Sequence, residues 1–196
     1  MANFIDEFMK TVGPEAADQI SKNLGIDKNT ASQILPKVAP LILGGLKKQK
    51  EEHGGQDRVD HILNKYGSDS VLDNIGDLIS NKAQDSNPDP KLGGLLGDSG
   101  VKAANMIANQ FKLDGNMAMK LIPMIAPLVL GTLTRKRDTG GAGSSGISAL
   151  LDQDGDGSIL DDVAGFLLGG GLGGRSSGKG NILGSILGSL LGGKRR

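Results

Sequence analysis

The chain has 196 residues, 22 acidic and 22 basic side chains, and neither cysteine nor tryptophan. The balanced charge gives no overall field that would attract nucleic acid. The missing cysteines exclude disulfides, thiolate metal sites and cysteine nucleophiles. Residues 1–30 contain several carboxylates and no long apolar run, so we expect no signal peptide and a cytoplasmic protein. We also expect no transmembrane segment, because the longest apolar stretches fall short of the roughly 18–20 residues that cross a bilayer.

Apolar residues recur at helical spacing along most of the chain, and alternation of period two is absent, which predicts an all-α fold. Asp27 is a plausible N-cap for one of these helices. Pro36 and Pro40 each lack an amide hydrogen, so we expect a helix to end at Pro36 and a new one to begin at Pro40. The predicted helices are residues 3–12, 14–23, 28–35, 40–50, 58–65 and 71–81, followed by a Pro/Asp-rich linker at 84–90.

The chain contains an internal duplication. Residues 13–48 align without a gap onto residues 100–135, with 14 of 36 positions identical, and residues 62–79 align onto 150–167 one position later. A repeat of this length indicates one supersecondary unit used twice. We therefore predict a first helical repeat at 1–97, a second at 98–168 and a Gly/Leu-rich tail at 169–196.

The best-preserved part of the repeat should form the core of each copy. It contains Leu35, Pro36, Ala39, Pro40, Leu41 and Leu43, and in the second copy Ile122, Pro123, Ala126, Pro127, Leu128 and Leu130.

Three segments carry a family resemblance. L-P-x-x-A-P-L-x-L-G occurs in both copies, D-G-D-G-S-I-L-D-D occurs at 154–162, and L-G-x-I-L-G occurs near the end of the chain. Together they resemble the bacterial DUF937 family, to which YidB-like proteins belong. The resemblance implies an all-helical domain, described as homeodomain-like for YidB-like members, and implies no established activity.

The acidic segment of the second copy predicts a calcium loop. Asp152, Asp154 and Asp156 alternate along a tight glycine-containing turn, as the first ligands of an EF-hand do, and Ser158 could add its backbone carbonyl. Asp161 or Asp162 would have to close the site, because the position of the usual bidentate glutamate is Val163. The alternative interpretation is a helix entry, with Ser158 as N-cap and Asp161 as its capping-box partner.

The sequence pattern of residues 20–35 is typical of a helix-turn-helix, so nucleic-acid binding is an alternative function. The exposed side chains would be Lys28, Asn29, Ser32 and Gln33, and in the second copy Gly115, Asn116, Met119 and Lys120. Neither set contains an arginine, and Lys112 replaces the turn glycine of the first copy. The other interpretation is that three short helices simply pack in this way.

Basic residues cluster at 47–50, 135–137 and 194–196. The first two clusters lie at the C-terminal ends of equivalent helices, where cations interact favourably with the helix dipole. The alternative is that the basic clusters form a shared surface for an acidic partner.

The tail contains a Gly/Ser-rich linker at 169–180 and then a segment with glycine at every fourth position, residues 184, 188 and 192. Such spacing lets another helix approach closely. We expect docking on the chain's own domain or on a neighbouring subunit, with a disordered tail and association with a membrane surface as alternatives.

We expect no enzymatic activity. The only imidazoles, His53 and His61, are flanked by charged residues and have the character of surface positions. The sequence therefore predicts a non-catalytic interaction or structural module that binds a protein partner or itself, with calcium as its candidate cofactor.

Overall fold

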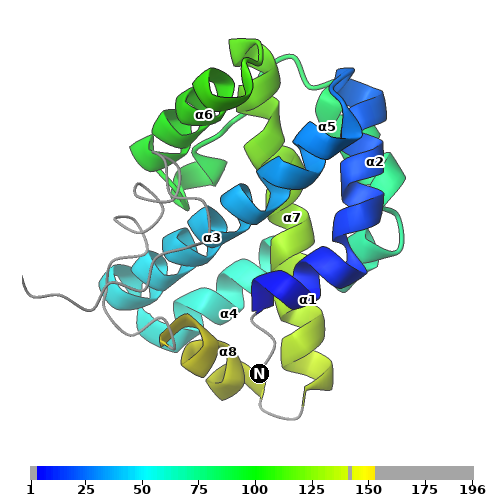
Figure 1. The fold of residues 1–196 in the computed structure, drawn as a ribbon. Helices are drawn as coiled ribbons and strands as arrows, with labels where there is room; N and C mark the ends of the chain where they lie inside the picture. The colour runs from blue at the N-terminus through cyan, green and yellow to red at the C-terminus, as the bar shows by residue number, and fades with distance from the viewer. Residues whose placement is uncertain (1–3, 141–142, 153–196) are drawn as a thin grey trace, which may run out of the picture.

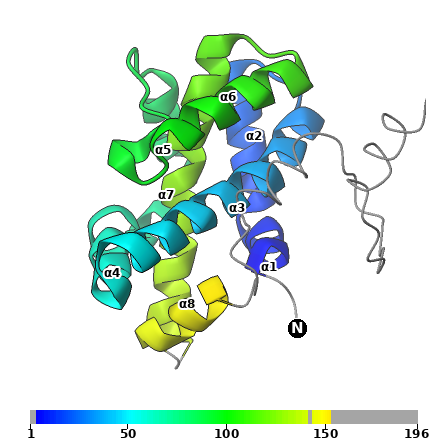
Figure 2. The same cartoon turned by 90° about the vertical axis from the view of Figure 1, so that its left-hand side faces the viewer.

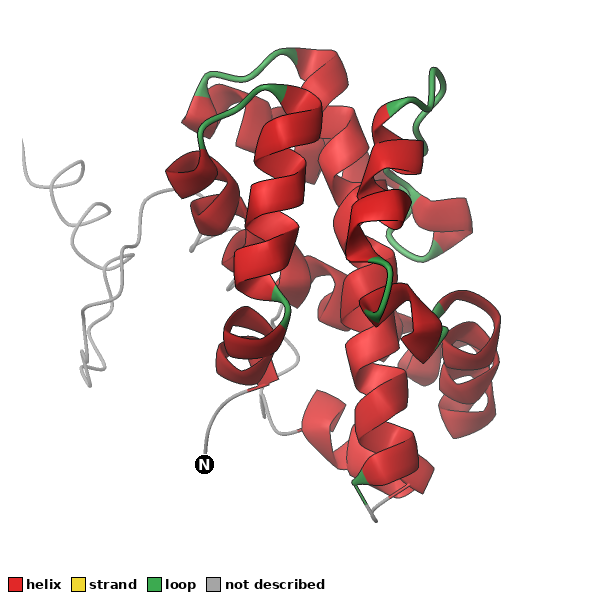
Figure 3. Ribbon diagram, turned by 90° about the vertical axis from the view of Figure 1, so that its right-hand side faces the viewer, coloured by secondary structure: helices red, strands yellow, loops and turns green. Residues whose placement is uncertain are grey.

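The computed structural model describes residues 4–140 and 143–152, in which all regular secondary structure is helical (Figures 1 and 3). The all-α prediction is confirmed for this part of the chain. The elements are α1 (Phe4–Thr11), α2 (Gly13–Leu24), α3 (Lys28–His53), α4 (Gly55–Tyr66), the 3-10 turn η1 (Asp69–Leu72), α5 (Ile75–Ala83), the 3-10 turn η2 (Leu92–Gly94), α6 (Asp98–Phe111), α7 (Gly115–Thr139) and α8 (Gly143–Asp152).

The duplicated segments have the same backbone course. The short helices α2 and α6 each end at a residue in the left-handed region, Gly25 with φ +69° and Lys112 with φ +54°. The long helices α3 and α7 each begin after an aspartate, and both carboxylates accept a backbone N–H at 2.8 Å. The prediction that Asp27 is the N-cap of α3 is therefore confirmed. The hydroxyl of Thr30, and next its backbone N–H, hold the pKa of Asp27 below its usual value by favouring the charged carboxylate.

The predicted break between Pro36 and Pro40 is wrong. Helix α3 runs through both prolines, and α7 runs through Pro123 and Pro127. Two prolines inside a helix cost about 6 kcal/mol in total. The α3 residues around the prolines offset this cost, because each buried aliphatic contributes about 1.5–3 kcal/mol. These residues are Ile34, Leu35, Val38, Leu41 and Ile42.

The single helix predicted at 71–81 is two elements, η1 and α5, separated at Asp73 and Asn74. Tertiary packing accounts for the difference. Turn η1 lies against α7, whereas α5 lies between α2 and α7, and one straight helix could not follow both surfaces. The other helix boundaries lie within a few residues of the predicted ones.

The two repeats share one core. Helix α3 crosses α7 near the middle of the molecule (Figures 1 and 2), and the buried apolar residues of both copies form one continuous cluster. The elements that follow each long helix also contact the other copy. Thus α4, η1 and α5 lie on α7, and α8 lies on α3 as well as on α7. All the predicted aliphatic core positions are buried, whereas of the four prolines only Pro123 is fully buried.

Helix α7 contains a long apolar stretch. Its 25 residues include an 18-residue window of mean hydropathy 1.6, so by length and composition it could cross a membrane. No such stretch was expected from the sequence. However, 78% of that window is buried inside the molecule, which is the environment of a core helix.

Candidate functional site

The predicted calcium site lies almost entirely beyond the described residues. Asp152 is the last residue of α8, and Asp154, Asp156, Ser158, Asp161 and Asp162 fall outside the described ranges, as does the tail at 169–196. Within residues 4–140 and 143–152, no three histidine, aspartate or glutamate side chains lie close enough to hold a metal ion.

The lysines of the two helix-turn-helix segments make contacts within the protein. The Lys22 ammonium lies 2.6 Å from Asp18, and Lys28 lies 3.2 Å from the same carboxylate, so both lysines lower the pKa of Asp18. In the second copy, Lys120 Nζ donates to the backbone carbonyl of Ala83 at 2.5 Å. Phosphate recognition needs cations that are free to pair with phosphates. Lys22 and Lys28 face solvent but already pair with a carboxylate of the same chain. These contacts favour the second interpretation of the segment, in which three short helices pack against one another without a role in nucleic-acid binding.

The basic cluster at the end of α7 joins the two copies. Arg135 pairs with Asp73 at 3.1 Å, and Lys136 pairs with Glu7. Arg137 lies 3.5 Å from Asp60 on α4 and 2.7 Å from Asp138, whose pKa it lowers. Each cation is therefore matched by a carboxylate of the same chain.

A cavity of about 410 Å³ lies between α4 and α7, beside η2. Its floor is apolar and comes from three elements: Ile62 on α4, Leu92 and Leu95 at η2, and Ala126 and Leu130 on α7. Ile62, Ala126 and Leu130 are buried core residues, so the floor is held by the packing of the fold. The volume falls in the range of roughly 300–1,000 Å³ that is usual for ligand pockets.

The rim of this cavity carries three cations and a histidine. Arg58, His61 and Lys65 follow one face of α4, and Lys82 of α5 completes the set. The one carboxylate of the lining belongs to Asp89, which accepts the backbone N–H groups of Lys91 and Gly93 at 2.9 and 2.8 Å. It therefore shapes the turn before η2 and leaves the rim with a positive excess.

Tyr66 stands at the edge of the cavity and is 54% exposed, the only large hydrophobic side chain of the described residues to be so exposed. The Lys65 ammonium lies 5.1 Å from the centre of its ring. Tyrosine is enriched where proteins bind partners, because the ring supplies contact area and the hydroxyl a hydrogen bond.

The two prolines of α7, Pro123 and Pro127, also line the cavity. Since Pro127 has no amide hydrogen, the carbonyl of Pro123 lacks its usual helical donor four residues later. The cavity thus combines an apolar floor and a cationic rim, which suits a ligand with apolar and acidic groups.

A second cavity, of about 480 Å³, lies between α1, α7 and α8. Its charged residues include Glu7 and Lys136, which pair with each other, and Arg135, which pairs with Asp73. Three of its four charged residues, all but Glu15, are thus matched within the chain, so this cavity offers less to a charged ligand than the one between α4 and α7.

The cavity between α4 and α7 was not expected from the sequence. His61 was predicted to lie on the surface, which is confirmed by its exposure, but no role was expected for Arg58, Lys65 or Tyr66. One signal was available: Tyr66 is the only tyrosine in the chain, and it directly follows a lysine.

The described residues therefore define an all-α protein in which two copies of one helical unit share a core. The chain belongs to the family described as "Bacterial protein of unknown function (DUF937)", whose model matches residues 6–136 and again 134–196. The model matches twice, as expected of tandem copies, and the first match spans the duplicated segments of both. The family assignment made from the three motifs is confirmed. No curated protein and no solved structure matches the chain. The homeodomain-like likeness therefore stays a prediction.

Proposed function

We propose that this protein is a non-catalytic interaction module that binds an acidic, apolar segment of a partner protein in the cavity between α4 and α7. The observation that carries the proposal is the apolar floor beneath a rim of Arg58, His61, Lys65 and Lys82. An amphipathic helix or an extended peptide could place aliphatic side chains on the floor and carboxylates at the rim.

The chemistry of the cavity supports binding rather than catalysis. Acid–base catalysis needs a base within hydrogen-bond reach of an orienting partner. His61 is exposed, and the other imidazole, His53, is exposed too, next to Glu52 at 3.8 Å. Arg58 is oriented by Gln49, whose side-chain oxygen accepts from Arg58 Nε at 3.0 Å, and a guanidinium held in this way is ready for a carboxylate.

A random peptide library displayed on phage tests this proposal, because it samples many partner sequences at once. We expect the full chain to enrich peptides that combine carboxylates with aliphatic residues. We also expect the Arg58→Glu, Lys65→Glu double variant to bind those peptides at least about tenfold more weakly, because both rim charges are reversed.

The matched control is Lys10→Glu with Lys102→Glu, which makes the same change in net charge at exposed positions outside the cavity lining. Enriched peptides without a charge bias, or equal losses in both double variants, would contradict the proposal.

We further propose that calcium stabilises the second copy through Asp152, Asp154 and Asp156, with Ser158 and Asp161 or Asp162 completing the ligands. The internal duplication supports this. The first copy has Asn64, Tyr66 and Ser68 where the second has its first three aspartates, so this position of the repeat folds without a cation site in α4 and η1. Three adjacent carboxylates repel one another unless a cation or a hydrogen-bond donor compensates their charge.

Calorimetry with calcium checks this second proposal. We expect the wild-type chain to release or absorb heat on calcium addition and to melt at a higher temperature, since a ligand that binds only the folded state stabilises it. The Asp154→Ala, Asp156→Ala double variant should show neither effect. A wild-type chain without heat and without a thermal shift would end the proposal and leave the helix-entry interpretation.

A further inference from the structure

The cavity between α4 and α7 contains a buried polar side chain that comes from a third helix, α3. Gln49 lines the cavity and is only 7% exposed. Its side-chain oxygen accepts a hydrogen bond from Arg58 Nε at 3.0 Å, whereas no residue of the described part of the chain accepts one from its amide nitrogen. Among the buried side-chain polar atoms of the described residues, only the Thr134 hydroxyl is both fully covered and without a partner, so the Gln49 nitrogen keeps access to open space. A ligand oxygen in the cavity would therefore satisfy an amide that is otherwise costly to bury.

A glycine of α3 explains why Gln49 is buried at this place. A Cβ added to Gly45 would lie 2.6 Å from a methyl carbon of Leu96 and 2.8 Å from the carbonyl oxygen of Leu95. The backbone after η2 therefore lies directly on α3. Gln49 follows Gly45 by four residues, so it lies on the same face of the helix. The cavity lining agrees with this position, because Leu95 and Arg58 belong to it together with Gln49.

The Arg58 guanidinium keeps one edge for an acidic ligand. Its Nε donates to Gln49, and no carboxylate of the described residues pairs with it. Arg135 of α7 differs in this respect, because it pairs with Asp73 at 3.1 Å. The two Nη groups of Arg58 therefore remain as paired N–H donors, and such a pair matches the two oxygens of a carboxylate.

The size of the cavity favours the end of a chain over the middle of a helix. One turn of an α-helix, about 10–12 Å across and 5.4 Å long, occupies roughly 420–610 Å³. The cavity holds about 410 Å³, so it admits one helical turn at most. A chain end needs less room, because no backbone has to leave on the other side.

The acidic and apolar contacts of the cavity are close together. Arg58 and Ile62 are four residues apart on α4 and are therefore neighbours on one face. In an extended peptide, an internal acidic residue and the aliphatic residue beside it point to opposite sides. A C-terminal aliphatic residue instead carries its carboxylate and its apolar side chain on the same Cα. One such residue meets Arg58 and Ile62 together.

We infer that the cavity receives the C-terminal residue of the partner protein. Its carboxylate lies against the Nη groups of Arg58 and the amide nitrogen of Gln49, and its aliphatic side chain rests on the apolar floor. Gln49 is the positioning residue, because its oxygen holds the guanidinium in place. This inference rests on the proposed function, since it specifies which group of the partner enters the cavity.

Paired synthetic peptides test the inference on the full chain. Random peptides are anchored through their N-termini in an array, each made once with a free C-terminal carboxylate and once with a C-terminal amide. The protein should prefer peptides whose last residue is aliphatic. It should bind their free-acid members at least about tenfold more tightly than the amide members, because hydrogen bonds to a charged group are the stronger ones.

The outcomes separate this inference from the proposed function. Peptides that bind equally well as acids and as amides, with a preference for internal aspartate or glutamate, would overturn the inference and leave the proposed function intact. An array without any preference for acidic or aliphatic groups would contradict both. Decanoic acid is added as a soluble probe. If it binds more tightly than every peptide, the occupant is a free aliphatic acid instead of a chain end, and the inference is also overturned.

Two substitutions test the roles of the polar residues. Gln49→Leu removes the acceptor and the donor together, and Arg58→Lys keeps the charge but loses the paired donors. Each should reduce the preference for the acid over the amide at least about threefold and change the binding of the amide members by less than about twofold. Equal weakening of both members by Gln49→Leu would indicate a purely structural role and would overturn the assignment of Gln49. Because Arg58 is exposed, Arg58→Lys keeps the test available if Gln49→Leu does not fold.

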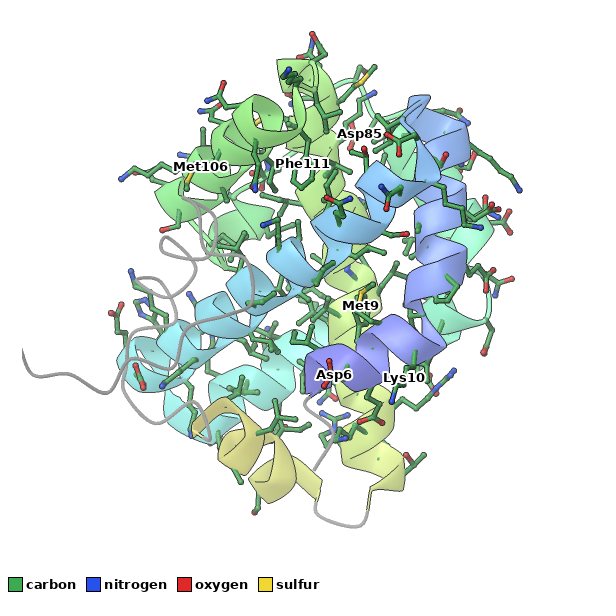
Figure 4. The ribbon with its side chains drawn as sticks, in the orientation of Figure 1. Asp6, Met9, Lys10, Asp85, Met106 and Phe111 are labelled. Carbon is green, nitrogen blue, oxygen red and sulfur yellow. The ribbon has the colours of Figure 1, made fainter. Side chains whose placement is uncertain are left out.

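The matched control exchanges the same two side-chain types at a distant position. Lys10 is exposed on α1, where Figure 4 labels it, and lies outside the cavity lining. Lys10→Arg should leave the preference for the acid unchanged. An equal loss of preference in Lys10→Arg and Arg58→Lys would show that the preference arises outside the cavity, and this result would overturn the inference.

Discussion

A fragment of residues 1–97 is expected to show no cooperative unfolding transition. In the whole chain, α3, α4, η1 and α5 all rest on α7, which this fragment lacks. Helix α7 contributes eight large apolar side chains that are at most 2% exposed: Leu121, Ile122, Met124, Ile125, Leu128, Val129, Leu130 and Leu133. Without α7, the apolar side chains of α3, α4, η1 and α5 that face it are exposed to water, at a cost of about 1.5–3 kcal/mol for each. A few such losses equal the total stability of many domains, roughly 5–15 kcal/mol.

Circular dichroism during a urea titration checks this expectation, with the full chain as reference. Mixing the fragment with residues 98–196 is the matched control, because the second fragment returns α7 to its partners and should restore a cooperative transition. A sigmoidal transition of 1–97 alone would contradict the shared core and support two self-sufficient repeats.

Gly100→Ala is expected to be the most damaging of the conservative substitutions in the helices. A Cβ at Gly100 would lie 1.9 Å from the carbonyl oxygen of Pro90 and 2.8 Å from its carbonyl carbon. Because both are backbone atoms, the segment before η2 has to move by more than an ångström. Forced overpacking usually costs about 1–3 kcal/mol and occasionally more. We expect a loss of about 3 kcal/mol in the free energy of unfolding, measured by urea titration.

The internal duplication supplies the control for this substitution. Gly13 is the repeat equivalent of Gly100, but a Cβ there would meet the terminal methyl carbon of Met9 at 3.0 Å, a flexible side chain that can turn away. Gly13→Ala should therefore change the free energy of unfolding by less than about 1 kcal/mol. We expect this change to be an increase, because alanine favours the helix more than glycine does. Equal losses of stability at the two positions would contradict this prediction, because they would show that the Pro90 backbone moves as easily as the Met9 side chain.

The local features of this fold follow from the sequence. Asp27 caps α3 because a carboxylate there reaches the free N–H groups of the first turn. The aliphatics around Leu35 and Ile122 are buried in both copies, as their helical spacing predicts. The duplication and the three motifs were sufficient to assign the family. The calcium loop is also a prediction from the sequence, and it lies outside the described residues apart from Asp152.

Long-range packing decided the rest. Propensity predicts a break at Pro36, yet the burial of the aliphatic side chains around it in the common core keeps α3 continuous. Asp60 and Arg137 are 77 positions apart, and no spacing in the sequence indicates that they pair. The cavity between α4 and α7 joins Arg58, Leu92 and Ala126, whose elements meet only after the two copies interlock. Capping and periodicity act within a few turns of the chain, and so the sequence alone determined the helices and their duplication. The burial of apolar surface between distant segments decides which helices pack against one another. The cavity is a result of that packing.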